Sequence, residues 1–282
     1  MTQIFRRVGV IGVLNATPDS FSDGGRFVDD SGVDVALGID LAAQMEKDGA
    51  SAIDVGGEST RPGAAQVAVD EEYERVVPLI EALAKRFEAP ISVDTRKADV
   101  AEAAIVAGAS LVNDVSGLRF DPEMAGVVAR FGAELIVGHS RGTPETMQDA
   151  PHYDDVIEEV GSELSASVSI ALDAGVDPQR ICVDPGLGFG KRPEDNHALL
   201  ARLGELSERV GGYGLVVGPS RKAFLGRLTG DAPAERDAAT VAACAIAVFQ
   251  GALAVRAHDV RGALRACQVG LALRDARRGA TP

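Results

Sequence analysis

The chain has 282 residues, of which 46% are hydrophobic, and a formal net charge of −14. This length and apolar content are enough for one large α/β domain. The acidic balance argues against a nucleic-acid partner, because phosphate backbones attract clustered Lys and Arg. An anionic substrate would therefore require positive charge to be concentrated at one place in the fold.

Two apolar segments and the cysteines bear on where the protein resides. The run Val8–Leu14 follows two arginines, as in an export signal, but it is short and no small-residue cleavage site follows, so we predict a first core strand. The run Val241–Ala257 contains Gln250 and Arg256 and is not expected to span a membrane. The three cysteines match no metal-binding spacing, and we predict buried, reduced thiols in a cytoplasmic protein.

Short β-branched apolar runs alternate in chain order with longer segments of mixed charge. The runs predict strands at Val8–Leu14, Ala52–Val55, Ile91–Val93, Leu111–Val112, Leu135–Val137, Ile181–Val183, Leu215–Val217 and Leu253–Val255. The segments between them predict helices at Asp34–Asp48, Asp70–Arg86, Lys97–Ala107, Pro122–Phe131, Tyr153–Ala174, Pro193–Val210 and Ala238–Gln250.

This alternation predicts the fold class. Parallel neighbouring strands need a crossover connection, and strands that are apolar throughout must be covered on both faces. Eight such units indicate an α/β protein with a closed (β/α)8 barrel (TIM barrel), and an open doubly wound sheet is the alternative. No linker divides the chain, so we expect a single domain over residues 1–282 with a frayed tail from about residue 274.

Polar residues follow nearly every predicted strand. In chain order they are Asn15, Gly56–Ser59, Asp94, Asn113–Asp114, His139, Asp184, Ser220–Lys222 and Arg256–Asp259. The C-terminal ends of all strands meet at one mouth of a parallel barrel, where active sites lie. An unpaired buried polar group costs about 1–3 kcal/mol, so this many at one rim indicate a polar ligand pocket rather than packing.

Two glycine-containing loops follow the first two strands. The loop Asn15–Gly25 is rich in turn-forming residues, but its length and the lone Phe21 favour a mobile active-site loop over a plain turn. In the loop Gly56–Gly63, Thr60 and Arg61 offer hydrogen-bond donors to an anion, with a surface turn as the alternative.

Three strand-end residues suit a flat heterocyclic ligand. Asp94, Asn113 and Asp184 are each able to cap a helix on their own. Together, two carboxylates and an amide bind the N–H donors of an aminopyrimidinone edge through paired hydrogen bonds. Because neighbours on a strand face opposite sides, only one of Asn113 and Asp114 is expected to face the barrel interior.

Positive charge is expected at the same mouth. Ser220–Lys222 supplies two cations, and Arg256 and His258 lie two residues apart, so they share one face of a strand; solvated surface charges are the alternative. The run Gly186–Lys191 lacks the spacing of a nucleotide-binding loop. We expect it to be a flexible turn that lets Phe189 border the pocket.

A competing motif, Gly138–Gly142, fits the G-x-S-x-G nucleophile elbow of serine esterases. Ser140, Asp184 and His258 also follow the chain order of such enzymes. The elbow requires a helix directly after the serine, whereas here a proline interrupts and the next strong helix is predicted at Tyr153. A serine esterase is therefore a distant alternative.

Seven motifs stand in a fixed order along the chain between Val10 and about Val269. They are Asn15–Gly25, Gly56–Gly63, Ser92–Thr95, Asn113–Gly117, Asp184–Lys191, Ser220–Lys222 and Arg256–Asp259. Together they resemble the motifs of the dihydropteroate synthase family of pterin-binding enzymes. The resemblance implies a (β/α)8 barrel, usually a homodimer, that condenses 6-hydroxymethyl-7,8-dihydropterin diphosphate with p-aminobenzoate. The products are 7,8-dihydropteroate and pyrophosphate, in folate biosynthesis.

The resemblance also implies residue roles. The pterin is expected to be held by Asp94, Asn113, Asp184 and Lys222. The diphosphate is expected to be contacted by Asn15, Thr60, Arg256 and His258, with Asn15 as a ligand of its Mg2+. The p-aminobenzoate pocket, which sulfonamides also occupy, is expected to be shaped by Phe21, Arg61, Pro62, Phe189 and Ser220. Catalysis is assigned to Asp94, Asp184, Lys222 and Arg256, with an SN1-like departure of the diphosphate.

Two departures from the family pattern affect the site. The family often has Met where this chain has Gly138, so that wall of the pterin pocket is expected to be looser or filled by another side chain. Pro219 precedes Ser220 and is expected to stiffen that turn. A methyltetrahydrofolate-binding homologue with a corrinoid partner shares the barrel and is the alternative function, although Asn15 and the diphosphate-contacting residues argue against it.

Overall fold

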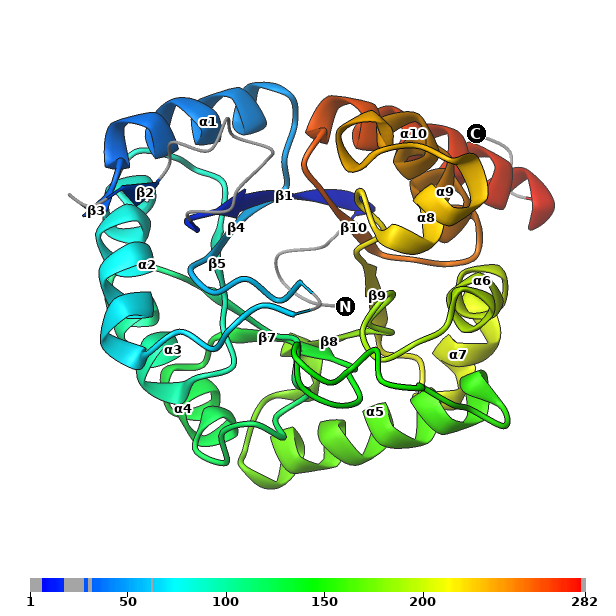
Figure 1. Ribbon diagram of the computed structural model, residues 1–282, viewed down its shortest axis with the longest axis horizontal. Coiled ribbons are helices and arrows are strands. Elements are labelled where there is room, and N and C mark those ends of the chain that lie inside the picture. The colour runs from blue at the N-terminus through cyan, green and yellow to red at the C-terminus, as the bar shows by residue number, and fades with distance from the viewer. Residues whose placement is uncertain (1–6, 18–27, 30–31, 62, 280–282) are drawn as a thin grey trace.

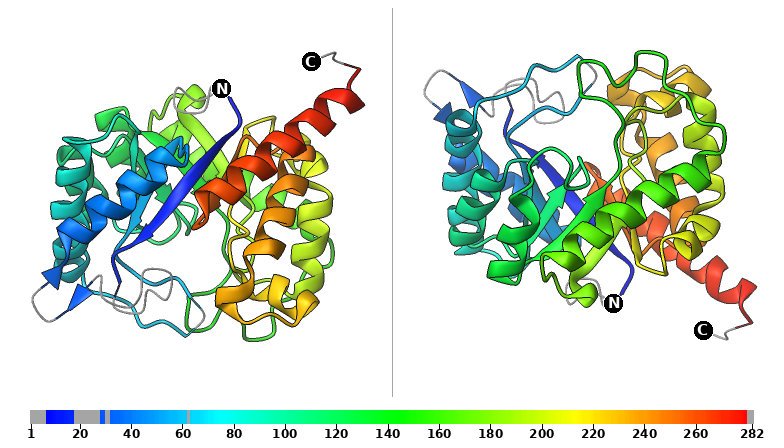
Figure 2. Two further views of the ribbon diagram at one scale, coloured as in Figure 1. Left: turned by 90° about the horizontal axis from the view of Figure 1, so that it is seen from above. Right: turned by 90° about the horizontal axis from the view of Figure 1, so that it is seen from below.

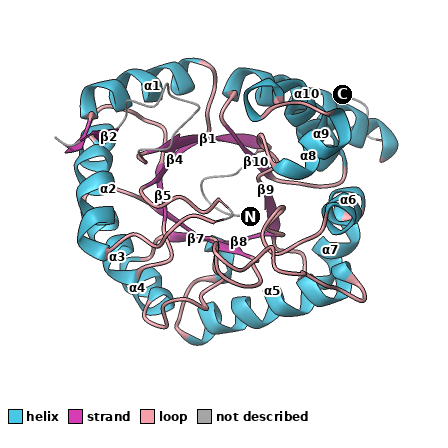
Figure 3. Ribbon diagram, viewed as in Figure 1, coloured by secondary structure: helices cyan, strands magenta, loops and turns pink. Residues whose placement is uncertain are grey.

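Eight parallel strands close into a barrel with helices around it (Figure 1; Figure 3). The structure is a computed structural model, and it describes residues 7–17, 28–29, 32–61 and 63–279. The barrel strands are β1 (Gly9–Asn15), β4 (Ala52–Gly56), β5 (Ile91–Asp94), β6 (Leu111–Asp114), β7 (Glu134–Gly138), β8 (Ile181–Asp184), β9 (Gly214–Val217) and β10 (Ala254–Ala257). All eight predicted strands are confirmed with small shifts at their ends, as is the single-domain (β/α)8 fold.

The outer ring of helices covers the strands on all sides (Figure 3). It consists of α1 (Val35–Lys47), α2 (Val69–Ala84), α3 (Ala98–Val106), α4 (Met124–Phe131), α5 (Val156–Asp173), α6 (Pro193–Ala201), α7 (Leu203–Arg209), α8 (Ala223–Thr229), α9 (Asp237–Phe249) and α10 (Val260–Arg277). Two 3-10 turns, η2 (Pro178–Arg180) and η3 (Pro233–Glu235), and an antiparallel pair, β2 (Val28–Asp29) with β3 (Gly32–Val33), complete the described elements.

The helices differ from prediction in three places. The predicted helix Pro193–Val210 is two helices, because the chain leaves helical geometry at Arg202 (φ −119°, ψ 29°). The side-chain amide of Gln250 donates to the carbonyl of Ala201 at 2.7 Å, so that carbonyl has a partner outside the helix. Helices α8 and α10 were not predicted, and α10 continues to Arg277, beyond the position expected for the start of the tail.

The barrel interior is apolar at one end and polar at the other. The apolar layer consists of Ile11, Ala52, Leu111, Ile136, Cys182, Val216 and Ala254. Side chains two residues further along the strands point into the same interior, so Asp54 and Arg256 lie one layer nearer the C-terminal ends of the strands. A larger cluster fills the space between the strands and the helices. The polar side chains are therefore gathered at one end of a dry barrel.

The connections that leave the strands gather at one face, opposite the face where β1 begins (Figure 2). This is the mouth to which the predicted site residues belong. The three cysteines are buried free thiols, as predicted. Among the described residues, no helix has the length and apolar character needed to cross a membrane.

Candidate active site

An arginine and two carboxylates form an ion-pair cluster inside the mouth. The Nη2 of Arg256 donates to Asp94 Oδ2 at 2.8 Å and also to Asp54 Oδ2. One oxygen of each carboxylate, and the Nε of Arg256, is buried without a hydrogen-bond partner among the described residues. Buried polar groups usually have partners, so these atoms mark a place where a polar ligand would complete the bonding.

A lysine and a carboxylate lie on the neighbouring strand ends. Asp184 ends β8, and its Oδ1 accepts a hydrogen bond from the amide of Gly186 at 2.7 Å. Lys222 donates to the carbonyl of Leu187, and its Nζ lies 4.1 Å from the ring centroid of Phe189. The turn after β8 therefore positions both Asp184 and Lys222, and it holds an ammonium against an aromatic face.

The alternation predicted at the end of β6 is confirmed. The side chain of Asn113 points into the barrel, where its Nδ2 donates to Asp54 Oδ2 at 3.4 Å. Asp114 faces the other way and accepts from the amides of Ser116 and Leu118. Asn113 thus belongs to the interior cluster, whereas Asp114 caps the following turn.

Burial brings two of these groups into the neutral pH range. It raises the pKa of Asp94 to about 7, although Arg256 opposes the shift. It lowers the pKa of Lys222 to about 8, although Asp184 opposes that shift. Burial also raises the pKa of Asp184, against the effects of Lys222 and of the Gly186 amide. Several titratable groups with shifted pKa values in one cavity are typical of catalytic sites.

A third polar group connects β1, β9 and β10. His258 Nδ1 lies 2.8 Å from Ser220 Oγ, and His258 Nε2 lies 3.3 Å from Asn15 Nδ2. Burial, with the charges of Arg221 and Arg256, lowers the pKa of His258 to about 4, so the ring is neutral at pH 7. If Asn15 Nδ2 donates to Nε2, the ring proton is on Nδ1 and bonds Ser220, which leaves the Asn15 amide oxygen free.

The structure brings most of the predicted site residues to one cavity of about 760 Å³. Its lining includes Asn15, Thr60, Arg61, Asp94, Phe189, Ser220, Lys222, Arg256 and His258. Asn113 and Asp184 are not in this lining: Asn113 bonds Asp54, the partner of Arg256, and Asp184, at the end of β8, bonds the amide of Gly186. Phe21 and Pro62 lie outside the described residues. The lining carries eight Lys and Arg residues against Glu58 and Asp94, so positive charge is concentrated there in an otherwise acidic chain.

Two features of the site were missed from the sequence. Asp54, which pairs with Arg256, stands alone inside the apolar run of β4, and that isolated charge was the available signal. Glu58 is buried behind the second loop, where it bonds Arg96 at 2.9 Å, lies 3.2 Å from Lys97 and accepts from the amide of Val67 at 2.8 Å. This network ties the base of the loop that carries Thr60 and Arg61 to the start of α3.

The position of Gly138 is closed. A Cβ at this residue would lie 2.7 Å from the Cα of Val115 and 2.9 Å from the carbonyl oxygen of Asp114. The backbone of the next turn occupies the space that a Cβ would need, whereas the looser wall of the pterin pocket stays a prediction. Contact with backbone also explains why this chain has glycine here.

The esterase motif lacks the required local structure. The loop after Ser140 continues to Val156 before a helix begins, so no nucleophile elbow forms. His258 is engaged with Ser220 and Asn15 rather than with Ser140.

The oxygen and nitrogen donors at the mouth suit a metal that binds together with an anionic ligand. Among the described residues, no group of three or more His, Cys, Asp or Glu is placed to hold a metal ion. Asn15 offers one amide oxygen at the cavity, next to the cluster that would face an anion. Mg2+ is commonly bound through one or two protein oxygens together with substrate phosphates and water. The site therefore fits a Mg2+ that arrives with a diphosphate, and not a cage formed by protein ligands alone.

The fold and this geometry define a (β/α)8-barrel enzyme whose mouth brings carboxylates and cations together at one cavity. The sequence model of the pterin binding enzymes matches residues 11–258, and the chain belongs to this family. A dihydropteroate synthase of Synechocystis is 46% identical over 95% of this chain and 91% of its own length.

Solved structures agree with this placement. Dihydropteroate synthase of Yersinia pestis, in a sulfonamide drug complex, has a TM-score of 0.89 and 40% identity, covering 97% of this chain and 95% of that one. The Xanthomonas albilineans enzyme with 4-aminobenzoic acid has a TM-score of 0.86 and 42% identity, covering 99% of this chain and 95% of that one.

Proposed function

We propose that this chain is a dihydropteroate synthase, which joins 6-hydroxymethyl-7,8-dihydropterin diphosphate to p-aminobenzoate and releases pyrophosphate. The observation that carries the proposal is the convergence of Asp94, Asp184, Lys222 and Arg256 on one mouth, from four different strand ends. The homologues that cover nearly the whole chain support the same reaction.

The pterin is assigned to the deeper part of the mouth. Asp94 and Asp184 supply carboxylates, Asn113 supplies an amide, and together they match the donors and acceptors of an aminopyrimidinone edge. Lys222 is positioned beside Asp184 to donate to a ring acceptor. The carboxylate oxygen of Asp94 that has no partner is available for this contact.

The diphosphate is assigned to Arg256, His258, Thr60 and Asn15, and Mg2+ to the amide oxygen of Asn15. Bound Mg2+ would neutralise charge that develops on the leaving group. Arg256 supplies a buried, permanently charged donor for the same purpose. An arriving diphosphate would also favour protonation of His258, which then donates to a phosphate oxygen.

The p-aminobenzoate is assigned to the outer part of the mouth, near Phe189, Ser220 and Arg61, together with Phe21 and Pro62. The phenyl ring of Phe189 offers a flat apolar wall, and the Ser220 hydroxyl and Arg61 offer donors to a carboxylate. We expect sulfonamides to compete for this position, as the complex of the Yersinia pestis relative suggests.

The transfer is proposed to be SN1-like. Departure of the diphosphate first leaves a cationic pterin methylene, for which Asp94 and Asp184 provide counter-charges. The amine nitrogen then attacks the methylene carbon and loses its proton, and no covalent enzyme intermediate forms. Oxygen-18 placed in the ester oxygen that joins the pterin methylene to the diphosphate should scramble to the non-bridging oxygens of the same phosphate when the amine is absent. Its complete retention would support direct displacement.

Turnover of the purified chain tests the function. With Mg2+, the pterin diphosphate and p-aminobenzoate, we expect equimolar pyrophosphate and 7,8-dihydropteroate. Lys222→Ala and Asp184→Asn should each lower activity at least about tenfold, or roughly 1.4 kcal/mol. Binding of a pterin without any pyrophosphate release would instead identify a binding homologue of the methyltetrahydrofolate type.

A homodimer in the cytoplasm is proposed on separate grounds. The family resemblance suggests the dimer, and Ile246 on α9 with Val269 and Leu273 on α10 are large apolar side chains left exposed on packed helices. The buried free thiols fit a reducing compartment. Light scattering after gel filtration should give twice the chain mass of 29.2 kDa, and a monomer would contradict the assignment.

A further inference from the structure

The turn that follows β8 is tightly wound. Gly186, Gly188 and Gly190 all have positive φ angles, of 64°, 85° and 61°. A Cβ at Gly186 would lie 1.7 Å from the carbonyl oxygen of His139, so only glycine fits there. The amide of Phe189 donates to Gly186 O at 3.0 Å, and the amide of Gly188 donates to Asn196 Oδ1 at 2.6 Å.

The inner side of this turn surrounds the ammonium of Lys191. Its Nζ lies 3.0 Å from the carbonyl oxygens of Gly186 and Phe189 and 2.8 Å from His139 Nδ1. Lys191 is 2% exposed. The carbonyl oxygen of His139 lies 3.4 Å from the same Nζ. Burial lowers the pKa of Lys191 well below its usual range, whereas these acceptors match the three protons of an ammonium group and favour its charged form. Although Lys191 lines the cavity, its donors are committed to the turn.

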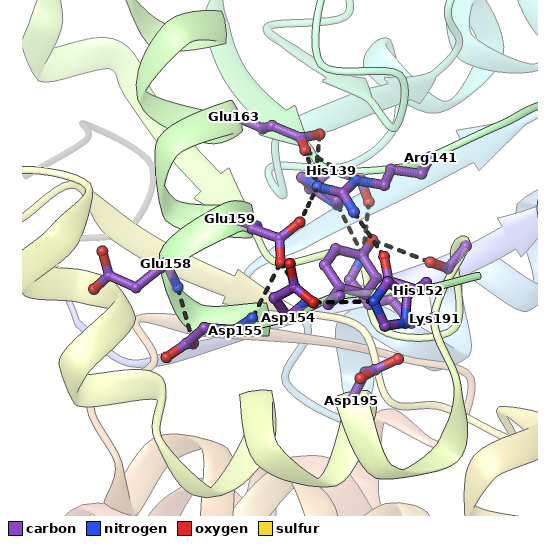
Figure 4. Close-up of polar contacts among 12 residues, drawn as sticks. His139, Arg141, His152, Asp154, Asp155, Glu158, Glu159, Glu163, Lys191 and Asp195 are labelled. Carbon is purple, nitrogen blue, oxygen red and sulfur yellow. Dashed lines mark hydrogen bonds and ion pairs between the residues drawn. The ribbon is translucent and has the colours of Figure 1, made fainter.

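The charge of Lys191 is connected to two further ionic groups through His139 (Figure 4). His139 Nε2 lies 3.1 Å from Glu163 Oε2, and Glu163 is ion-paired with Arg141. Burial and the charge of Lys191 lower the pKa of His139 to about 3, so its ring is neutral. A neutral ring that donates from Nε2 to Glu163 presents its Nδ1 lone pair to Lys191. The chain of contacts thus fixes the tautomer that accepts from Lys191.

The outer side of the same turn makes the contacts that hold the site. The carbonyl of Leu187 accepts from Lys222, and the ring of Phe189 lies against the Lys222 ammonium. The amide of Gly186 bonds Asp184. One short turn therefore has a buried lysine on its inside and the proposed pterin and p-aminobenzoate residues on its outside.

We propose that Lys191 is a positioning residue: its buried ammonium holds the turn Gly186–Gly190 closed from within and so sets the places of Lys222 and Phe189. His139 and Glu163 support it by presenting the correct acceptor. The roles of Lys222 and Phe189 rest on the proposed function, whereas the effect of Lys191 on the turn does not.

Lys191→Met tests the proposal, because methionine keeps the length of the side chain and removes its charge and donors. Lys85→Met is the matched control, since Lys85 is exposed and pairs only with Glu81 among the described residues. We expect Lys191→Met to raise the KM for p-aminobenzoate and for the pterin substrate at least about tenfold. A merely structural role would reduce the amount of active enzyme and leave both KM values unchanged, which would overturn the proposal.

A pair of substitutions at His139 separates positioning from folding. In His139→Asn the Oδ1 atom takes the place of Nδ1 as an acceptor for Lys191, whereas His139→Leu removes the acceptor. We expect near-normal KM values for His139→Asn and raised values for His139→Leu, with both variants folded by circular dichroism. Equal KM values in the two variants would contradict the proposal, even if Lys191→Met fails to fold.

Hydrogen exchange provides a readout that does not depend on catalysis. In the wild-type chain the amides of Gly188 and Phe189 should be protected by their bonds within the turn, and in His139→Leu they should exchange at least about tenfold faster. If exchange is faster in His139→Leu but the wild-type chain shows no turnover, the positioning proposal stands and the proposed function is rejected. Unchanged exchange together with normal turnover would reject the positioning proposal alone.

Discussion

Arg256 on β10 reaches Asp94 on β5 across the two strands that lie between them in the barrel, β1 and β4. The contact lies inside the mouth, where the proposed pterin and diphosphate positions meet. A diphosphate that engages Arg256 and a pterin that engages Asp94 would compete with this ion pair. Ligand binding is therefore expected to exchange an internal salt bridge for contacts with the two halves of one substrate.

Asp54→Asn should impair use of the pterin substrate. Asp54 pairs with Arg256 and accepts from Asn113, so its charge sets the direction in which both side chains point. We expect kcat/KM for the pterin diphosphate to fall at least about tenfold, or roughly 1.4 kcal/mol. Asp99→Asn, at an exposed position of α3, is the control and should have no effect. Equal kcat/KM values for the two variants would show that Asp54 does not contribute to use of the pterin substrate.

The pH profile of kcat/KM should have an acidic limb and a basic limb, both near neutral pH. Asp94 binds ring N–H groups as a carboxylate, so kcat/KM should rise as pH increases through about 7. Lys222 donates as an ammonium, so kcat/KM should fall as pH increases through about 8. In Lys222→Arg the cation stays charged, and the basic limb should disappear while the acidic limb remains. A flat profile in the wild-type chain would contradict both assignments.

The free energy of unfolding should also depend on the ionisation of Asp94. Folding raises the pKa of Asp94 from 3.8 to about 7, so the folded chain holds a proton that the unfolded chain has released. The free energy of unfolding should therefore decrease as pH rises through this interval. Urea unfolding of Asp94→Asn should show a weaker decrease over the same interval than the wild-type chain. Identical pH slopes would show that Asp94 is already ionised in the folded state at low pH.

Asn15→Leu should weaken the response to Mg2+. The substitution removes the amide oxygen that we assign to the metal and leaves a side chain of similar size. The Mg2+ concentration at half-maximal activity should rise at least about tenfold at saturating substrates. Ser51→Ala, at a partly buried position just before β4, is a control that should leave the Mg2+ titration unchanged. An unaltered titration in Asn15→Leu would place the metal elsewhere.

Gly138→Ala should destabilise the fold. The added methyl group would meet the backbone of Val115 at 2.7 Å, and backbone moves less readily than the end of a side chain. We expect a loss of about 1–3 kcal/mol in the free energy of unfolding. Gly126→Ala is the matched control, because a Cβ there has no neighbour within 4 Å and lies in α4. It should be neutral or stabilising, since Ala favours a helix over Gly by about 1 kcal/mol.

Much of the fold was predictable because its signals are local. Each barrel strand is a short apolar run, and a parallel barrel places all the following polar residues at one mouth, so the sequence alone indicates that Asp94, Asp184 and Arg256 lie there. At the break at Arg202, the carbonyl of Ala201 is bonded by Gln250, a residue far along the chain, and this contact cannot be predicted from the segment itself.

The parts of the site that escaped prediction are buried partners. Asp54 and Lys191 act on residues that are remote in sequence, Arg256 and His139, and single-chain patterns do not show which strands face one another across a barrel. The spacing of Gly186–Lys191 showed only that it was not a nucleotide loop. Its three positive φ angles, and the cation that its carbonyls enclose, accompany packing against His139 and Arg141, just after β7.

A crystal structure of the chain with Mg2+ and a non-hydrolysable analogue of the dihydropterin diphosphate tests the central claim most directly. The account predicts the pterin edge within hydrogen-bond distance of Asp94 and Asp184, and Arg256 turned from a carboxylate to the diphosphate. An analogue bound outside this mouth, with Arg256 still paired to both Asp54 and Asp94, would contradict it.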